Sequence, residues 1–332
     1  MSTKRERSGD AARRIIIDTD PGIDDALAIL LALGAPNIRV EGLTIVCGNG
    51  NNIKQLGANA KMLARNAGHD VPVCLGDAPL DEGADAQAVP NHVHGDDGLG
   101  GKAEKWGRSE QDFQDFHPKS AAQFIVDMCT ASPGEITLVC VAPLSNVAAA
   151  LALCPELPQL VQEVVIMGGA VHGELRGNRA PAAEANFVGD PEAAQAVLTA
   201  GFRSVILADL GMTHQTDIVV LRQACVQELP KSQVARMIFE VSQMFIDCYL
   251  NTFKQPVAPA HDVVAVMYLV RPDLFTRKPC RVEVELQGTL TRGMSVPDWK
   301  GRWQKPNNVE VLMTVDTKRF VEEYVSAMRQ LP

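Results

Sequence analysis

The chain contains 332 residues, of which 46% are apolar and 21% carry a charge, and 31 Lys and Arg against 40 Asp and Glu give a formal net charge of −9. This composition is typical of a globular protein and excludes general disorder, which goes with low apolar content and high charge. It also argues against nucleic acid or an anionic membrane as a partner, since both attract an excess of Lys and Arg.

The N-terminus and the cysteines indicate the cellular setting. Residues 1–13 are polar and charged without an apolar core, so we expect a flexible tail and no secretory signal. No apolar run approaches the roughly 20 residues that a membrane-spanning helix needs. The eight cysteines contain no CxxC pair, which predicts reduced, buried thiols. We therefore expect a soluble cytoplasmic protein.

Short apolar runs alternate with helical patterns over the first two thirds of the chain. Strands are predicted at residues 15–17, 40–46, 71–75, 136–141, 163–167 and 204–207. Helices are predicted at residues 24–33, 53–67, 118–129, 144–153 and 191–200. Apolar strands separated by helices are typical of a parallel sheet with both faces covered. The predicted fold is therefore α/β and Rossmann-like, with an open, mostly parallel sheet and helices on both faces.

The last third of the chain has a different pattern, which predicts a C-terminal helical and hairpin elaboration. Its expected elements are helices at 218–253, 261–270 and 317–328, a hairpin of 281–286 with 290–296, and a strand at 309–315. No linker or repeat separates it from the rest, so we expect one catalytic domain over residues 14–332. Residues 76–117 show little periodicity, and loops of that length are usually functional or disordered.

The strongest local feature is the segment from Asp18 to Asp25, which follows an apolar strand and opens a helix. Aspartates occupy positions 18, 20, 24 and 25. Ligands of an open parallel sheet bind beyond the carboxyl ends of its strands, so we expect four carboxylates at the mouth of a site. Helix capping accounts for one or two of them, but four so close together repel one another unless a cation is present. Ligands that are all oxygen favour Ca²⁺ or Mg²⁺ over zinc.

Polar residues also follow the other predicted strands. Asn49 follows the second strand, backbone carbonyls near Val141 end the fourth, and Met167 ends the fifth. Three polar residues come further along, at Asn178, Glu184 and Asn186. An isolated asparagine of this kind is more often a turn residue. As a set at one sheet edge, these residues indicate a ligand with several hydroxyl groups, such as a sugar.

Three histidines are candidates, although each alone is more often structural or solvent-facing. His261 and Asp262 begin a predicted helix. His92 and His94 lie in the long loop with a spacing that suits a transition metal, but no third soft ligand accompanies them.

Together these motifs resemble those of the inosine–uridine-preferring nucleoside hydrolases. The matching segments are DTDPGIDDA at 18–26, HGDDG at 94–98, MGG at 167–169, Asn178, EAN at 184–186, DPEAA at 190–194 and HD at 261–262. The resemblance runs from about residue 14 to the C-terminal helix. It implies Ca²⁺-dependent hydrolysis of ribonucleosides to ribose and free nucleobase in nucleoside salvage, with inosine, uridine and guanosine as expected substrates. It also implies a homo-oligomer, either a dimer or a tetramer.

The resemblance implies a role for each matching residue. The Ca²⁺ ligands would be the carboxylates of Asp20, Asp25 and Asp262 with the backbone carbonyl of Val141. Asp20 would also be the general base that takes a proton from the attacking water, and His261 would assist the leaving group. The substrate contacts would be Asp24, Asn49 and Asn186 at the ribose 2′- and 3′-hydroxyls, Asn178 and Glu184 at the 5′-hydroxyl, Met167 at the ribose, and His94 and Tyr249 near the base. One departure from the motif is Ala185, where the family often carries Phe.

The chemistry of the reaction agrees with this set of residues. N-glycosidic cleavage passes through an oxocarbenium-like state, which nearby negative charge stabilises. An activated water on one side and an acid on the other imply direct displacement with inversion.

Two other classes stay open at this point: a phosphohydrolase with a strand-end Asp nucleophile, and a non-catalytic ribose or nucleoside binder. The base preference is also open among 6-oxopurine-specific, inosine–uridine-preferring and nonspecific. The loops expected to face the base, 76–101 and 243–258, contain few sequence features that would indicate this preference.

Overall fold

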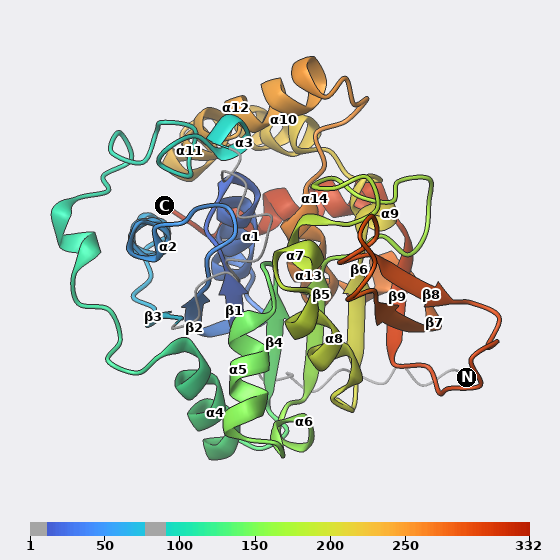
Figure 1. Cartoon of the computed structure of the whole chain (residues 1–332). Coiled ribbons are helices and arrows are strands. Elements are labelled where there is room, and N and C mark those ends of the chain that lie inside the picture. Colours follow the sequence, from blue (N-terminus) through green and yellow to red (C-terminus); the bar gives the residue numbers. More distant parts are fainter. Residues whose placement is uncertain (1–11, 77–90) are drawn as a thin grey trace, which may run out of the picture.

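The computed structural model describes residues 12–76 and 91–332. Within that part of the chain the strands are β1 (Arg13–Thr19), β2 (Ile38–Ile45), β3 (Val73–Leu75), β4 (Ile136–Cys140), β5 (Glu163–Met167), β6 (Val205–Ala208), β7 (Phe275–Val284), β8 (Ser295–Asp298) and β9 (Val309–Val315). They form one sheet in the order β3-β2-β1-β4-β5-β6-β9-β7-β8 (Figure 1). All pairs from β3 to β9 in that order are parallel, and β7 is antiparallel to both β9 and β8. The predicted open, mostly parallel sheet is confirmed.

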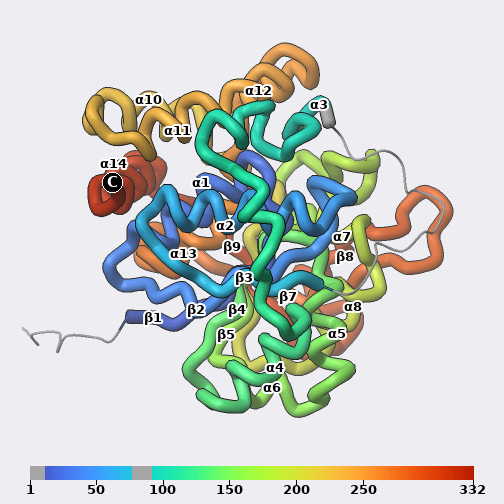
Figure 2. Tube along the Cα trace, turned by 90° about the vertical axis from the view of Figure 1, so that its left-hand side faces the viewer, coloured from blue at the N-terminus to red at the C-terminus, as the bar shows by residue number. Residues whose placement is uncertain are grey.

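Helices cover both faces of this sheet, as predicted. The longer ones are α1 (Ile23–Gly34), α2 (Ile53–Asn66), α4 (Ala121–Ala131), α5 (Ser145–Leu153), α8 (Pro191–Thr199), α10 (Ile218–Glu228), α11 (Gln233–Val241), α13 (His261–Val270) and α14 (Thr317–Met328). Short helical segments are α3 (Asn91–His94), α6 (Leu157–Leu160), α7 (Ala185–Gly189), α9 (Leu210–Thr213), α12 (Gln243–Asp247), a π-helix at Cys248–Thr252, and 3₁₀ turns at Glu110–Phe113 and Pro272–Leu274. Figure 2 shows α10, α11 and α12 above the sheet beside α3.

The side chains of strand β1 show how the two faces of the sheet are packed. Its side chains alternate, so Ile15 and Ile17 pack with α1 and α13 in one hydrophobic cluster, while Ile16 packs with α4 and α5 in the other. All three are fully buried. A strand that is buried on both faces is therefore continuously apolar, which is why this run predicted a central parallel strand.

The C-terminal hairpin is confirmed, but the prediction that its second strand begins at residue 290 is wrong. Residues 288–294 form a turn, in which the backbone N–H of Gly293 donates to the carbonyl oxygen of Glu285 at 2.7 Å, and β8 begins only at Ser295. Leu290, which the alternating pattern placed in a strand, is 87% exposed at this turn. β7 is also longer than expected, because it pairs first with β9 and then with β8.

Other expectations concern the termini and the thiols. All eight cysteines are free, and most are buried, as predicted. In the part of the chain that the structure describes, no helix is both long and apolar enough to cross a bilayer. The expected tail over residues 1–13 falls almost entirely outside the described residues, and β1 already begins at Arg13.

The close approach of α1 to α14 gives a test of the packing. A Cβ added at Gly34 would meet the backbone carbonyl of Ala327, with the carbonyl carbon 2.9 Å away. Gly34→Ala should therefore lower the free energy of unfolding in urea by about 1–3 kcal/mol, because backbone must shift to admit the methyl group. Ser326→Ala, on the exposed side of α14, is the control and should change it by less than about 0.5 kcal/mol. Equal stability of Gly34→Ala and wild type would contradict this packing.

Candidate active site

Asp18 does not lie at the mouth of a site, and that expectation is wrong. Its side chain is on the same face of β1 as Ile16, under α5, and is 1% exposed. Thr44 Oγ1 and Asn146 Nδ2 donate to its Oδ1 at 2.6 Å and 2.8 Å. Burial raises the pKa of this carboxyl to about 7 against the opposing effect of these two hydrogen bonds. Asp18 thus joins β1, β2 and α5 inside the fold.

Asp25 is the centre of the hydrogen bonds that shape the segment after β1. It is the third residue of α1, fully buried, and its carboxylate accepts from the Gly22 N–H at 3.0 Å, which caps the helix. The hydroxyl of Thr19 donates to its other oxygen at 2.5 Å, and the Asp20 N–H reaches the same oxygen at 3.3 Å. The chain between β1 and α1 is therefore wrapped around this one carboxylate.

Asn49, which follows β2, connects two of these aspartates. Its backbone N–H donates to Asp20 Oδ2 at 2.6 Å, and its side-chain Nδ2 lies 3.2 Å from Asp20 Oδ1. The same Nδ2 is 2.9 Å from Asp25 Oδ2. The neighbouring Gly48 leaves room for this arrangement, because a Cβ there would collide with Asp20 Oδ2.

Three carboxylates converge at the carboxyl edge of the sheet. Asp24 and Asp25 from α1 and Asp262 from the first turn of α13 each offer an oxygen, and these oxygens lie within 4.8 Å of one another. All three side chains are buried, and Asp24 Oδ1 has no hydrogen-bond partner among the described residues. Asp20 is adjacent to this group but is not one of the three.

The charges in this group have no Lys or Arg partner among the described residues. In residues 12–76 and 91–332, no Lys or Arg forms an ion pair with Asp20, Asp24, Asp25 or Asp262. Burial and mutual repulsion raise the pKa of Asp20, Asp24 and Asp262 well above the usual range. A buried set of carboxylate oxygens with one orphaned acceptor fits a hard divalent cation, which would compensate their charge.

The loop after β5 supplies a second set of polar groups. Glu184 caps α7, and its carboxylate accepts from the N–H groups of Asn186 at 2.9 Å, Gly169 at 2.9 Å and Phe187 at 3.1 Å. Burial raises its pKa to about 7 in spite of these bonds. Asn178 holds the same turn, since its Oδ1 accepts from the Ala185 N–H at 2.9 Å.

Asn186 links this loop to the ends of β4 and β5. Its Nδ2 donates to the carbonyl oxygens of Val141 at 3.2 Å and Met167 at 3.1 Å. The Val141 carbonyl, which the resemblance implies as a metal ligand, therefore accepts a hydrogen bond from Asn186. Ala185, at the position where the resembled motif often carries Phe, is exposed.

Histidines and aromatic rings form the third side of the site. His94 Nδ1 accepts from the Ile23 N–H at 3.1 Å and lies 4.0 Å from Asp24 Oδ1. Burial lowers the pKa of His94 to about 3, so this ring is neutral. His261 Nε2 is 2.9 Å from the Tyr249 hydroxyl, and Phe245 stacks on Tyr249 with 4.6 Å between the ring centres.

Sequence reasoning missed Phe245 and Thr213. Phe245 is four residues before Tyr249 and shares its helical face, so the aromatic spacing was the available signal. Thr213, whose Oγ1 lies 2.8 Å from His261 Nδ1, follows the end of β6, where the strand-end rule applies. His92 does not join His94: it is exposed and packs edge-on against Phe253.

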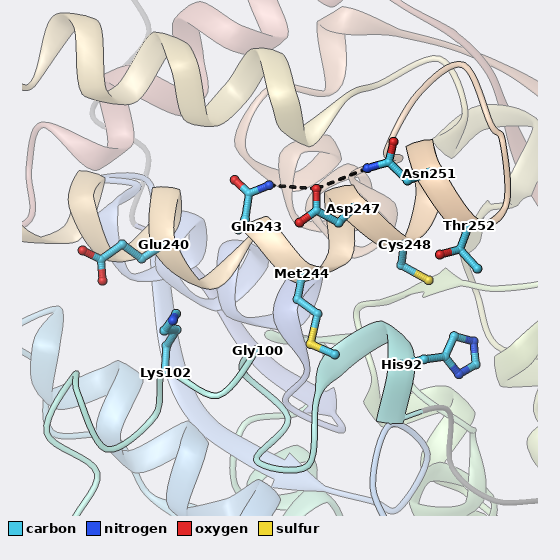
Figure 3. Close-up of a pocket in the computed structure, with 10 residues that line it drawn as sticks. All are labelled: His92, Gly100, Lys102, Glu240, Gln243, Met244, Asp247, Cys248, Asn251 and Thr252. Carbon is cyan, nitrogen blue, oxygen red and sulfur yellow. Dashed lines mark hydrogen bonds between the residues drawn. The ribbon is translucent and has the colours of Figure 1, made fainter.

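A cleft of about 500 Å³ lies on another side of the helical segment that carries Phe245 and Tyr249. Figure 3 shows its lining residues, with Gln243, Met244, Asp247, Cys248 and Asn251 from α12 and the π-helix opposite His92, Gly100 and Lys102. The buried carboxylates of the candidate site, those of Asp20, Asp24, Asp25, Glu184 and Asp262, do not line it. Part of the expected base-facing loop 76–101, residues 77–90, is outside the described residues.

Comparison with known proteins gives a consistent match over nearly the whole chain. Residues 15–322 match the family model described as inosine-uridine preferring nucleoside hydrolase. The non-specific ribonucleoside hydrolase RihC of Escherichia coli is 37% identical over 308 residues, which are 92% of this chain and 95% of RihC. A plant nucleoside hydrolase structure has a TM-score of 0.85 at 30% identity, covering 95% of this chain and 98% of its own. A purine-preferring ribonucleoside hydrolase from Gardnerella vaginalis has a TM-score of 0.84 at 28% identity, covering 95% and 98%.

The acidic group predicts a response to divalent cations that needs no substrate. Saturating Ca²⁺ or Mg²⁺ added to chelator-treated protein should raise the melting temperature by about 5–10 °C, because only the folded state assembles the carboxylates. Asp262→Asn should melt higher than wild type without cations, since it removes one of the crowded charges, and should gain less from cations. Asp70→Asn, an exposed aspartate, is the control and should behave as wild type. No cation effect on the wild-type protein would contradict a metal site.

Proposed function

Because this chain belongs to the inosine–uridine-preferring nucleoside hydrolase family and is a hydrolase of N-glycosyl bonds, we propose that it hydrolyses ribonucleosides to ribose and free nucleobase with Ca²⁺ as its cofactor. The observation that supports the mechanism is the buried acidic group at the sheet edge, with which no Lys or Arg of the described residues forms an ion pair. An oxocarbenium-like transition state develops positive charge on the ribose, so a negatively charged pocket binds it more tightly than the neutral substrate.

The proposed metal ligands are the carboxylates of Asp20, Asp25 and Asp262 and the carbonyl oxygen of Val141. Asp25 and Asp262 belong to the converging group, and Asp20 shares the donor Asn49 with Asp25. This combination of carboxylate and carbonyl oxygens suits Ca²⁺, which takes six to eight oxygen ligands. A bound divalent cation lowers the pKa of a water molecule and helps to orient it.

Asp20 is the proposed general base. The backbone N–H and side-chain amide of Asn49 hold both of its oxygens, so the carboxylate has a defined orientation. Burial alone disfavours the charged form of Asp20. A bound cation would favour the charged form, so the carboxylate would be ionised and able to accept a proton. We assign it the proton that leaves the attacking water.

The proposed ribose contacts lie around this group. Asp24, with an unpartnered oxygen, Asn49 and Asn186 are assigned to the 2′- and 3′-hydroxyls. Hydrogen bonds to the 2-hydroxyl strengthen in the transition state, so these residues act on the rate as well as on binding. Glu184 and Asn178, which hold the turn before α7, are assigned to the 5′-hydroxyl, and Met167 to the ribose.

The leaving-group side is assigned to His261, with His94 and Tyr249 near the base. A nucleobase departs poorly as an anion, and a hydrogen-bond donor or acid lowers that barrier. Relatives include a non-specific and a purine-preferring ribonucleoside hydrolase, so we propose inosine, uridine and guanosine as substrates.

We also propose that residues 14–332 act as one catalytic unit in a cytoplasmic homo-oligomer, a dimer or tetramer. Support for a single unit comes from the candidate site itself, because its aspartates come from the first and the last third of the chain, at Asp25 and at Asp262.

Release of ribose from ribonucleosides tests the proposed function. The enzyme with Ca²⁺ in phosphate-free buffer should release reducing sugar and free base from inosine, uridine and guanosine. 2′-Deoxyinosine should react at least about tenfold more slowly, because it lacks the 2-hydroxyl contact. The proposal fails if none of these nucleosides, nor adenosine or cytidine, yields ribose. 4-Nitrophenyl phosphate is the control substrate, and its hydrolysis would indicate a phosphohydrolase instead.

Asp20→Asn tests the base. The amide keeps the shape of the side chain but cannot take a proton, so kcat for inosine should fall about 10²-fold or more. The circular dichroism spectrum should match wild type, and the melting temperature of the metal-free protein should not fall below the wild-type value, because the change removes one of the crowded charges. Asp70→Asn serves as the matched control. Turnover of Asp20→Asn near the wild-type rate would exclude the role of base.

A further inference from the structure

The imidazole of His261 is held at both of its nitrogens. Nδ1 lies 2.8 Å from Thr213 Oγ1, and Nε2 lies 2.9 Å from the Tyr249 hydroxyl. The side chain is buried, with 4% of its surface exposed. A neutral imidazole has one N–H donor and one acceptor, so only one of the two contacts uses a ring hydrogen. Which nitrogen carries it decides what the ring presents to the site.

The position of Thr213 is determined by the short helix α9. Asp209 caps this helix by accepting from the Met212 N–H at 3.2 Å. The same carboxylate accepts from the Val171 N–H at 2.6 Å and so joins α9 to the loop after β5. Thr213, at the last position of α9, is fully buried. These hydrogen bonds fasten α9 to the loop after β5 and so fix the position of the Thr213 hydroxyl beside His261.

The hydroxyl hydrogen of Thr213 has two acceptors within reach, and one of them is already engaged. The carbonyl oxygen of Leu210 accepts from the His214 backbone N–H at 3.1 Å and faces His214 Nδ1 at 2.9 Å, which must be an N–H because a carbonyl only accepts. Thr213 Oγ1 is more distant from that oxygen, at 3.4 Å. A carbonyl oxygen has two lone pairs, and the two shorter contacts use both. The Thr213 hydrogen is therefore directed to His261 Nδ1.

We propose that Thr213 is a positioning residue that donates its hydroxyl hydrogen to Nδ1 of His261 and thereby places the ring hydrogen on Nε2, toward Tyr249 and the site. The Tyr249 oxygen then accepts from Nε2–H, so its own O–H can donate to the departing base. This inference rests on the proposed function for its consequence, but the position of the ring hydrogen holds whether or not the protein turns over a nucleoside.

Thr213→Val removes the donor and keeps the shape of the buried side chain. Nδ1 then lacks a partner, and the preference for hydrogen on Nε2 is lost. We expect kcat for inosine to fall about tenfold or more, while 4-nitrophenyl riboside, whose leaving group departs unaided, changes less than about threefold. Thr213→Ser keeps the hydroxyl and should restore most of the inosine rate. His261→Ala should have the same selectivity with a larger loss.

The matched control is Thr137→Val. Thr137 is a fully buried threonine of β4 whose hydroxyl has no partner among the described residues, so the same exchange there should leave both substrates unaffected. Equal losses of the two substrates in Thr213→Val, or no rescue by Thr213→Ser, would overturn the positioning role.

Nitrogen-15 NMR of histidine-labelled protein gives the readout that a purely structural role would not move. The His261 signals, assigned by their absence in His261→Ala, should report hydrogen on Nε2 in wild type and in Thr213→Ser, and loss of that preference in Thr213→Val. A wild-type ring with its hydrogen on Nδ1 would overturn the inference. Absence of nucleoside turnover together with the expected NMR result would instead reject the proposed function and keep the tautomer assignment.

Discussion

The rest of this structure depends on the crowding of buried carboxylates at one edge of the sheet. Asp24, Asp25 and Asp262 approach within ligand distance of one another while remaining almost inaccessible to water. Such a group is costly to fold, since burial and mutual repulsion both disfavour its charges. The surrounding backbone and amide donors reduce that cost for Asp25, whereas Asp24 keeps an unpartnered oxygen. A divalent cation would compensate these charges. Under the proposed function, the positive charge that develops on the ribose would do the same.

The sheet explains how residues so far apart in the chain reach one place. β1, β4, β5 and β6 are parallel neighbours, so the loops after them open at the same edge. The aspartates, the Asn186 amide and the Thr213 hydroxyl each follow one of these strands or a helix packed on them. The helical segment at α12 adds the aromatic side of the site from the last third of the chain. The charged residues thus lie at the strand ends, and under the proposed function the base would lie against the helical segment.

Much of the fold was predictable because local sequence and tertiary position agree. The apolar run of β1, the helix at His261–Val270 and the strand at Val309–Val315 lie where the patterns indicated. The hairpin was the exception. An alternating pattern around Leu290 resembles a strand, but the turn at residues 288–294 exposes it, and only the pairing partner determines where β8 begins.

The sequence by itself determined the family and the sheet, and it predicted the acidic and amide residues of the site, because these occur in short ordered motifs whose spacing follows from strand and helix geometry. Only the tertiary structure decided which of the four early aspartates face the carboxyl edge of the sheet. Asp18 turns inward to Thr44 and Asn146, since side chains alternate along a strand and one face of β1 is covered by α5. Only the structure brought Thr213 to His261, because that contact joins segments 48 residues apart and leaves no local pattern.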